Sequence, residues 1–375
     1  MRVVYLDHVA RLSGGELALL GLIRSIRGEV DPYVVLGEDG PLVERFREEG
    51  IAVEVVPIAP RLRDFRKGRI RAHSLDPRVL ALLAVYVFRL ARRLRELHPD
   101  LVHTNSLKSS LYGGIAGRLA RVPVVWHVRD RISGDYLPPS AVRLVRLAAR
   151  FLPAAVVANS QTTLATLPHA RRGTVVYNPV EPPPVLAARE GELTVGVVGR
   201  LAPWKGQHVF LGAFAAAFRG QPVGARIVGA ALFGEEDYEL QLREQARELG
   251  ISDQVEFRGF REPIWDELAE LDVLVHSSTV PEPFGQVVLE GMAAGLPVVA
   301  AAAGGPAELI TDGADGLLVT RNDAKALAAA LERLAADPDL RLRLGNAARE
   351  RSRAFTPAAT ASRMLEIYVA VARRL

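Results

Sequence analysis

The sequence predicts an α/β protein built from two Rossmann-like domains, each with a parallel sheet covered by helices. At 375 residues the chain is longer than a single hydrophobic core usually grows. Short apolar runs bounded by turn residues alternate with amphipathic helical stretches along the whole chain, which is typical of parallel sheets wrapped by helices. Val180–Pro184 carries three consecutive prolines. Because proline neither continues a helix nor donates to a strand ladder, we place the interdomain linker there.

The apolar runs that we assign to strands fall on both sides of this linker. In the first half they are Val3–Leu6, Tyr33–Leu36, Val53–Val56, Leu101–His103, Val124–His127, Val156–Ala158 and Val175–Tyr177. In the second half they are Val195–Val198, Arg226–Val228, Val255–Arg258, Val273–His276, Val298–Ala300 and Leu317–Val319, with helix from Asp323 onward.

Composition excludes several classes of protein. With 49% hydrophobic and 24% charged residues, the chain is typical of a globular protein and not of a disordered or fibrous one. The longest apolar run, Val79–Phe88, falls far short of the roughly 20 residues that span a bilayer, so we expect a buried helix there. The N-terminus has no secretory signal pattern, and the absence of cysteine excludes disulfides and thiolate metal sites. These features favour the cytoplasm.

Charge is unevenly shared between the halves. Residues 1–180 contain 27 Lys and Arg against 16 Asp and Glu. This excess indicates either an anionic partner, such as a phosphate-bearing acceptor or a membrane surface, or simply an arginine-rich composition, since only four of the 47 basic residues are lysine. We expect no nucleic-acid partner.

The most basic stretch of the first half is Arg61–His73, which has almost nothing to bury, and we expect it to form a mobile loop. Arg66, Lys67 and Arg69 within it could bind an acceptor phosphate or lipid head groups, or could simply be solvated.

Glu282 and Glu290 form an E-x7-E arrangement directly after a predicted strand. The next helix should start near Phe284, which puts Gly285 in its first turn, where backbone N–H groups and the helix dipole favour a phosphate or an electron-rich oxygen. Along one helix face the two carboxylates would lie about 12 Å apart, whereas a retaining glycosidase needs about 5 Å. The spacing therefore suits the two ends of an elongated ligand better than hydrolysis. The alternative is a capping carboxylate and an exposed helix residue.

Two further segments could bind an anion in the second half. Gly304–Glu308 is a glycine turn that opens another helix, so donors from two helix starts could converge on one anion. Arg200 and Lys205 follow the strand Val195–Val198, at the sheet edge where open α/β sheets bind ligands. Arg200 could fork onto a diphosphate, and Lys205 could add a point charge. Asp337–Pro338–Asp339 superficially resembles a metal motif, but its place between two helices indicates capping.

The first half offers two weaker signals. His127 ends a predicted strand, where it could face a cleft and orient a sugar, although a histidine there is commonly structural. Ser13–Glu16 is a glycine loop before a helix, in which Gly15 could approach a phosphate. The loop lacks the full G-x-G-x-x-G pattern, which disfavours NAD binding.

In this order the pieces resemble the retaining glycosyltransferases of the GT-B fold, and specifically the glycosyltransferase family 4 group, over nearly the whole chain. The segments that carry the resemblance are Pro281–Glu308, Gly199–Gly206, His103 to Asp130, Asn159–Ser160 and Asn178–Val180. The resemblance implies an acceptor-side domain at 1–181, a donor domain at 185–355, an interdomain cleft between them and a last helix, 356–375, that crosses back to the first domain.

The resemblance also implies transfer of a hexose from a UDP- or GDP-type nucleotide sugar, with retention of anomeric configuration and without metal or cofactor. Glu290 would bind the donor ribose, Arg200 and Lys205 the diphosphate, and Glu282 with the Phe284 and Gly285 backbone the donor sugar.

Further implied donor contacts are Gly15, which would approach the phosphate, and Arg258, Gly259 and Phe260, which would flank the nucleobase. His127 would contact the sugar near the reacting carbon, so the expected catalytic set is His127, Arg200, Lys205 and Glu282. Arg129 is a candidate acceptor contact.

The chain departs from the family pattern at Pro179, where a glycine is usual, and in the acceptor regions Arg61–His73 and Ile132–Leu137, which match nothing assignable. Two rival functions remain open. A sugar-nucleotide 2-epimerase shares the fold, and a non-catalytic protein could bind nucleotide sugars without turnover.

Overall fold

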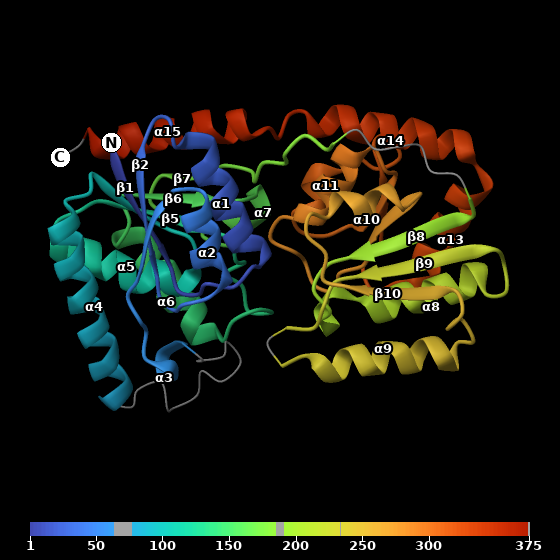
Figure 1. The fold of residues 1–375 in the computed structure, drawn as a ribbon, viewed down its shortest axis with the longest axis horizontal. Coiled ribbons are helices and arrows are strands. Elements are labelled where there is room, and N and C mark those ends of the chain that lie inside the picture. Colours follow the sequence, from blue (N-terminus) through green and yellow to red (C-terminus); the bar gives the residue numbers. More distant parts are fainter. Residues whose placement is uncertain (64–76, 185–190, 233, 374–375) are drawn as a thin grey trace. The chain divides into compact units, whose positions relative to one another are not determined.

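The computed structural model describes residues 1–63, 77–184, 191–232 and 234–373. Met1–Pro179 and Pro357–Leu375 form one compact unit, called unit 1, and Val180–Thr356 form unit 2 (Figure 1). Of the basic segment 61–73, the first residues belong to the short helix α3 (Pro60–Arg63). Arg66, Lys67 and Arg69 lie outside the described residues.

Unit 1 contains a seven-stranded sheet in the order β3-β2-β1-β4-β5-β6-β7, in which all neighbours pair in parallel. Its strands are β1 (Arg2–Asp7), β2 (Asp31–Leu36), β3 (Ala52–Val55), β4 (Leu101–Thr104), β5 (Val124–Val128), β6 (Ala155–Ala158) and β7 (Gly173–Val175). The strand expected at Val175–Tyr177 therefore lies two residues earlier, because β6 pairs with Gly173 to Val175.

Helices cover both faces of this sheet. Side chains alternate across β1, so that Val3 and Tyr5 pack into one hydrophobic core while Val4 and Leu6 pack into the other. The first core is closed by α1 (Gly14–Ile26), α2 (Pro41–Glu48) and α15 (Pro357–Ala372). The second is closed by α4 (Pro77–Leu97), α5 (Leu107–Ala120) and α6 (Pro139–Phe151), while the short α7 (Gln161–Ala165) follows β6.

The apolar run Val79–Phe88 is helical, as expected, but the expectation that it is buried is wrong. In α4 only one side of the run faces the core, where Tyr86 and Val87 are each 5% exposed. Val85 is 50% exposed and Phe88 is 65% exposed. An apolar run can therefore place large side chains on the outer face of a helix that covers a sheet from one side.

Unit 2 contains a six-stranded parallel sheet in the order β10-β9-β8-β11-β12-β13. Its strands are β8 (Leu193–Val198), β9 (Val223–Val228), β10 (Val255–Gly259), β11 (Val273–His276), β12 (Val298–Ala301) and β13 (Leu317–Val319). Its helices are η3 (Pro203–Lys205), α8 (Gln207–Phe218), α9 (Glu236–Glu248), α10 (Trp265–Ala269), α11 (Gln286–Ala294), α12 (Pro306–Leu309), α13 (Ala324–Ala336) and α14 (Pro338–Ser352).

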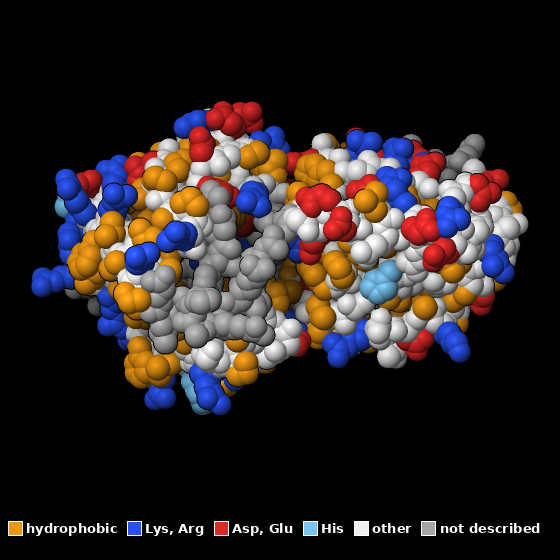
Figure 2. Space-filling model, turned by 90° about the horizontal axis from the view of Figure 1, so that it is seen from below, with side chains coloured by type: hydrophobic (Ala, Val, Ile, Leu, Met, Phe, Trp, Pro, Cys, Tyr) orange, Lys and Arg blue, Asp and Glu red, His pale blue; other side chains and the backbone are white. Residues whose placement is uncertain are grey.

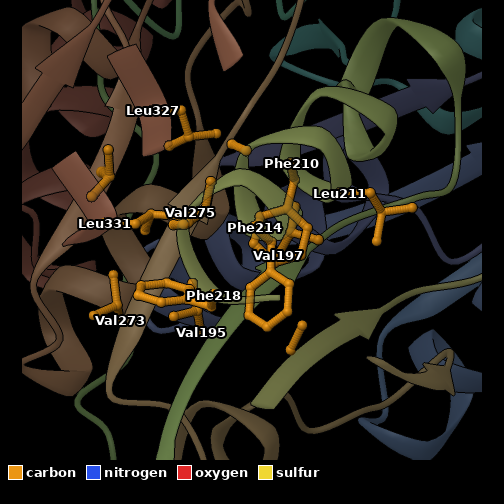
Figure 3. Close-up of a cluster of buried hydrophobic side chains, with 14 of the residues drawn as sticks. Val195, Val197, Phe210, Leu211, Phe214, Phe218, Val273, Val275, Leu327 and Leu331 are labelled. Carbon is orange, nitrogen blue, oxygen red and sulfur yellow. The ribbon is translucent and has the colours of Figure 1, made fainter. Parts of the chain in front are cut away.

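The largest core of unit 2 lies between the sheet and α8. Phe210, Phe214 and Phe218 recur every four residues, so they form one stripe along α8 that faces the alternate residues Val195 and Val197 of β8 (Figure 3). This packing fixes the N-terminus of α8, and hence the preceding loop, against the carboxyl end of β8.

Asp337 caps α14, since its carboxylate accepts a hydrogen bond from the Leu340 N–H at 2.8 Å. The capping role that we expected for the Asp337–Pro338–Asp339 motif is confirmed.

Both sheets reverse their strand order once. In unit 1 the chain moves from β1 outward to β3 and then returns to place β4 on the other side of β1; in unit 2 the same reversal separates β8 from β11. Ligands of open α/β sheets bind outside the carboxyl ends of the strands at such a reversal. The candidate sites are therefore the residues that follow β1 and β4 in unit 1, and β8 and β11 in unit 2.

Candidate functional site

In unit 2, two loops meet at the strand reversal. Gly206 lies between η3 and α8 with φ +74°, in the left-handed region that glycine accepts most readily. A Cβ at this position would lie 2.0 Å from the carbonyl oxygen of Ser277, which follows β11. Gly206 therefore allows the loop after β8 to pack against the loop after β11, and this brings Lys205 and Glu282 together.

The centre of the unit 2 site is a buried cluster of three ionisable side chains. Lys205 Nζ donates to one carboxylate oxygen of Glu282, and His276 Nε2 contacts the other. Because a carboxylate only accepts hydrogen bonds, Nε2 of His276 carries the proton. Burial opposes ionisation of Glu282, but the Lys205 ammonium and the His276 imidazole outweigh it, and the pKa of Glu282 lies well below its usual range.

Two cations of this site flank one aromatic ring. The ammonium of Lys205 lies 4.7 Å from the centroid of the Trp204 ring, and the guanidinium carbon of Arg200 lies 5.7 Å from it. Arg200 also faces Glu235, with 3.5 Å between Nε and the carboxylate. The loop after β8 thus presents a fork-shaped cation and a point cation side by side.

The helix after Glu282 begins close to its expected start. α11 begins at Gln286, two residues later than expected, and Gly285 precedes it as N-cap with φ +92°. Glu290 is partly exposed on α11. Burial raises the pKa of Glu290 to about 7, although the Gln286 side chain and the charge of Lys205 act in the opposite direction. Glu290 therefore titrates near neutral pH and feels the charge of Lys205.

The expectation that a second helix start at Gly304–Glu308 adds free backbone donors is wrong for Gly305. The Gly305 N–H donates to the carbonyl of Glu282 at 2.9 Å, so this donor is used within the chain. A Cβ at Gly305 would lie 2.2 Å from the carbonyl oxygen of Phe284, although its φ of −59° suits any residue. The glycines of this turn therefore let it pack against the Glu282 loop and hold that loop in place.

The expected nucleobase residues lie at the end of β10. The Arg258 guanidinium binds the carboxylate of Glu267 at 3.1 Å, and the Gly259 carbonyl accepts from the Gly229 N–H at 2.8 Å. Phe260 is 50% exposed. Because β9 separates β10 from β8, these residues lie one strand away from the cation-bearing loop and are not part of the Lys205 cluster.

At the strand reversal of unit 1 a hydrogen-bond network surrounds Arg129. Its guanidinium donates to the side-chain carbonyl of Asn105 at 2.7 Å and to that of Asn178 at 2.6 Å. The Asn105 amide in turn donates to Asp7 at 2.7 Å and to the Gly15 carbonyl at 3.0 Å. The network joins the ends of β1, β4 and β5 to the first turn of α1, which contains Gly14 and Gly15, and it brings Arg129 and Gly15 together.

The His127 side chain is 2% exposed and lies within the hydrogen-bond network of unit 1. Its Nδ1 lies 3.3 Å from an Arg129 N–H and 3.3 Å from Nε2 of His103, whose Nδ1 lies 2.7 Å from the Tyr368 hydroxyl. Burial, reinforced by Arg129 and His103, lowers the pKa of His127 far below its usual value.

These contacts assign the protons of the two imidazoles. An arginine N–H can only donate, so Nδ1 of His127 accepts and the neutral ring carries its proton on Nε2. His103 then donates from Nε2 to His127 and accepts from Tyr368. Nε2 of His127 has no hydrogen-bond partner within the part of the chain that the structure describes. It is a buried N–H donor.

Sequence reasoning missed four groups that shape these sites: His276, Trp204, and the amides of Asn105 and Asn178. His276 had a visible signal, because it ends a predicted strand six residues before Glu282. Trp204 lies inside the segment between the two expected cations. Nothing in the spacing of Asn105 and Asn178 indicates that they meet at Arg129.

Comparisons with known proteins identify the family of the chain. A family model described as "Glycosyl transferases group 1" matches residues 181–351, and one described as "Glycosyltransferase Family 4" matches residues 41–182. The lipopolysaccharide core biosynthesis glycosyltransferase LpsE of Rhizobium meliloti is 36% identical over 41% of this chain and 42% of that protein. The match thus spans less than half of that relative's length.

Two other proteins match over most of their length. The GDP-mannose-dependent alpha-mannosyltransferase of Mycobacterium tuberculosis is 32% identical over 74% of this chain and 78% of that protein. The crystal structure of Anabaena Alr3699/HepE in complex with UDP and glucose has a TM-score of 0.85 and 30% identity, covering 98% of this chain and 99% of that one. The chain, which contains two parallel-sheet α/β units, therefore belongs to glycosyltransferase family 4 and has the GT-B fold.

Proposed function

We propose that the chain is a retaining, metal-independent glycosyltransferase that moves a hexose from a UDP- or GDP-type nucleotide sugar to an acceptor. The observation that carries the proposal is the cluster of Arg200, Lys205 and Glu282 at the carboxyl ends of β8 and β11. Binding a diphosphate requires cations, which Arg200 and Lys205 supply, and binding sugar hydroxyls requires hydrogen-bond acceptors, which the Glu282 carboxylate supplies. All three lie on the two loops that follow β8 and β11.

The donor diphosphate is assigned to Arg200 and Lys205. The planar guanidinium suits bidentate contact with phosphate oxygens, and the ammonium adds a compact charge. Both would stabilise the negative charge that grows on the leaving nucleotide as the bond from the anomeric carbon to the phosphate oxygen breaks. Lys205 is held by Glu282 in the structure, so the ammonium is already positioned before the donor binds.

The remaining donor contacts follow from the chemistry of the other residues. Glu290 is assigned to the ribose diol, and Glu282 with the backbone of Phe284 and Gly285 to the hydroxyls of the transferred sugar. In unit 1, Gly15 is assigned to the phosphate and the unused Nε2–H of His127 to a sugar oxygen. Arg258, Gly259 and Phe260 are assigned to the nucleobase, chiefly through their backbone.

The low pKa of Glu282 supports a mechanism without a protein general base. A carboxylate held by Lys205 and His276 is too weak a base to deprotonate a hydroxyl near neutral pH. The leaving diphosphate oxygen can take that proton instead. The acceptor oxygen then bonds to the anomeric carbon on the face from which the phosphate departs, which retains the configuration.

The names of the relatives support the donor class. One is GDP-mannose-dependent, and a solved structure of similar fold contains UDP and glucose. An acceptor that is anionic or lipid-linked would suit the basic N-terminal half, and Arg129 together with Arg66, Lys67 and Arg69 are the assigned acceptor contacts.

Purified protein incubated with UDP-glucose or GDP-mannose, and with neutral, phosphorylated and lipid-linked acceptors, tests the proposal. We expect an α-linked product by proton NMR, and turnover that persists in EDTA. Epimerised donor without any acceptor would support the 2-epimerase, and nucleotide binding without turnover would support a non-catalytic protein. The matched variants are Lys205→Met, which should lose transfer, and Lys325→Met on exposed α13 of the same unit, which should not.

A further inference from the structure

Exposed large hydrophobic side chains gather on three helices of unit 1. Elsewhere among the described residues such side chains are scattered, with Leu240, Phe260 and Leu342 in unit 2. Single exposed apolar residues are ordinary, but a contiguous set marks a surface that another body covers. The set, here called the α4–α6 face, consists of Leu80, Leu82, Val85 and Phe88 of α4, Ile115 and Leu119 of α5, and Leu144, Leu147 and Phe151 of α6, which are 36% to 65% exposed.

The three helices form one continuous layer. All three pack against the same face of the sheet through a shared core. Arg118 of α5 donates to the Phe151 carbonyl at the end of α6, and Arg95 of α4 donates to the Leu119 carbonyl at the end of α5. Apart from the neighbouring Leu80 and Leu82, the exposed side chains recur every three or four residues, so they line the outer face of helices whose inner face is already buried.

The three helices are also strongly basic. α4 contains five Lys or Arg residues, α5 two and α6 three, whereas Glu96 is the only acidic residue in the three helices. Glu96 is paired with Arg92 at 2.9 Å. Arg89, Arg143 and Arg150 are exposed among the hydrophobic side chains. Figure 2 shows hydrophobic and basic side chains side by side on one face of unit 1.

We propose that the α4–α6 face binds the surface of an anionic lipid bilayer. Leucine and phenylalanine side chains enter the boundary between head groups and acyl chains, and the arginines between them bind lipid phosphates. Within the described residues no helix is long and apolar enough to cross a bilayer, so the face lies on the membrane and does not span it.

The charge pattern selects a lipid surface over a second copy of the chain. A two-fold dimer through this face would bring the same basic helices against each other, and like charges facing each other are unfavourable. An anionic bilayer complements the basic side chains that lie exposed among the hydrophobic ones, such as Arg89, Arg143 and Arg150. The face consists of unit 1 residues and the Lys205 cluster of unit 2 residues, so substitutions in one leave the other unchanged and the two proposals can fail independently.

Cosedimentation of the full chain with vesicles tests the proposal. We expect binding to vesicles of phosphatidylcholine with 30% phosphatidylglycerol, little binding to pure phosphatidylcholine, and a fall in binding as NaCl rises from 0.1 to 0.5 M. Arg143→Gln with Arg150→Gln should lower partitioning about thirtyfold, at roughly a fivefold loss per cation. Leu144→Ser with Leu147→Ser and Phe151→Ser should lower it more than tenfold.

The matched control is Leu240→Ser with Leu342→Ser, which removes equally exposed side chains from unit 2 and should bind vesicles like the unchanged protein. Thermal shift with UDP and GDP reports the donor site and should be the same for all variants. Equal binding to both vesicle types, or full binding by the triple variant, would overturn the proposal. So would a dimer by light scattering that the triple variant converts to a monomer.

Discussion

Glu290→Gln should stabilise the protein at pH 8 while lowering its transfer activity. The pKa of Glu290 rises from its ordinary 4.5 to about 7 in the folded protein, chiefly because of burial. The folded state therefore holds the proton more tightly than the unfolded chain does, and stability is lost as pH rises from about 4.5 to 7. Glutamine keeps the shape of the side chain and carries no charge, so it avoids this loss.

The structure sets the size of the effect. At 1.36 kcal/mol per pKa unit, the shift corresponds to about 3 kcal/mol above pH 7. Glu290 is partly exposed, and water reduces the effect, so we expect a gain of about 1 to 3 kcal/mol in the free energy of unfolding at pH 8. At pH 4.5 the two proteins should differ by less than about 0.5 kcal/mol.

Urea denaturation at the two pH values measures this, with Trp204 and Trp265 as fluorescent reporters within unit 2. Glu332→Gln, an exposed change on α13, is the control and should leave stability unchanged at both pH values. Transfer by Glu290→Gln should fall at least tenfold, because the amide accepts hydrogen bonds from the ribose diol more weakly than a carboxylate. A gain of equal size at pH 4.5 and pH 8, or a loss at pH 8, would refute the reasoning.

Four further substitutions probe other contacts. Lys205→Met should lower the transfer rate at least tenfold, which corresponds to about 1.4 kcal/mol in activation free energy. It should also destabilise the protein more at pH 7 than at pH 4, because the buried Glu282 carboxylate loses its main counter-ion. Urea denaturation that shows the same loss of stability at both pH values would contradict this. Gly305→Ala should lower the free energy of unfolding by about 1 to 3 kcal/mol, because the new Cβ would collide with backbone atoms. Gly212→Ala is the control: it lies in a helix, its Cβ would have 3.9 Å of space, and it should raise the free energy of unfolding by up to about 1 kcal/mol. Equal melting temperatures of the two variants would refute the steric argument. Tyr368→Phe should lower the free energy of unfolding by about 1 kcal/mol, since it removes the buried hydrogen bond to His103. If unfolding followed by Trp126 fluorescence gave the stability of the unchanged protein, this bond would contribute nothing.

The fold class follows from the sequence because two local signals agree along the chain. Strand-forming runs such as Val273–His276 are short, apolar and bounded by turn residues, and they coincide with observed strands. The position of β7 was predicted two residues too late, because it is set by pairing with β6, and no local sequence pattern encodes that pairing. The exposed side of α4 was missed for a related reason, since an all-apolar run does not tell which of its sides faces the sheet.

The site was predictable where one segment carries it. Glu282, Gly285 and Glu290 lie within nine residues, and the turn and helix between them were expected close to where they occur. The pairing of Lys205 with Glu282 joins residues 77 positions apart, and it depends on Gly206 permitting two loops to touch. Such a contact is a property of the folded sheet and has no trace in spacing.

The position of α15 determines the order in which the two units can finish folding during synthesis. Met364 and Tyr368 are fully buried in the core of unit 1, against α1 and the sheet. Residues 357–372 leave the ribosome only after all of unit 2 has been synthesised. Until then, unit 1 lacks α15, and the part of its hydrophobic core that α15 covers stays exposed. Unit 2 is contiguous in the chain and can finish folding first. The exposed hydrophobic surface of unit 1 must then be protected from aggregation by chaperones or by rapid completion of translation.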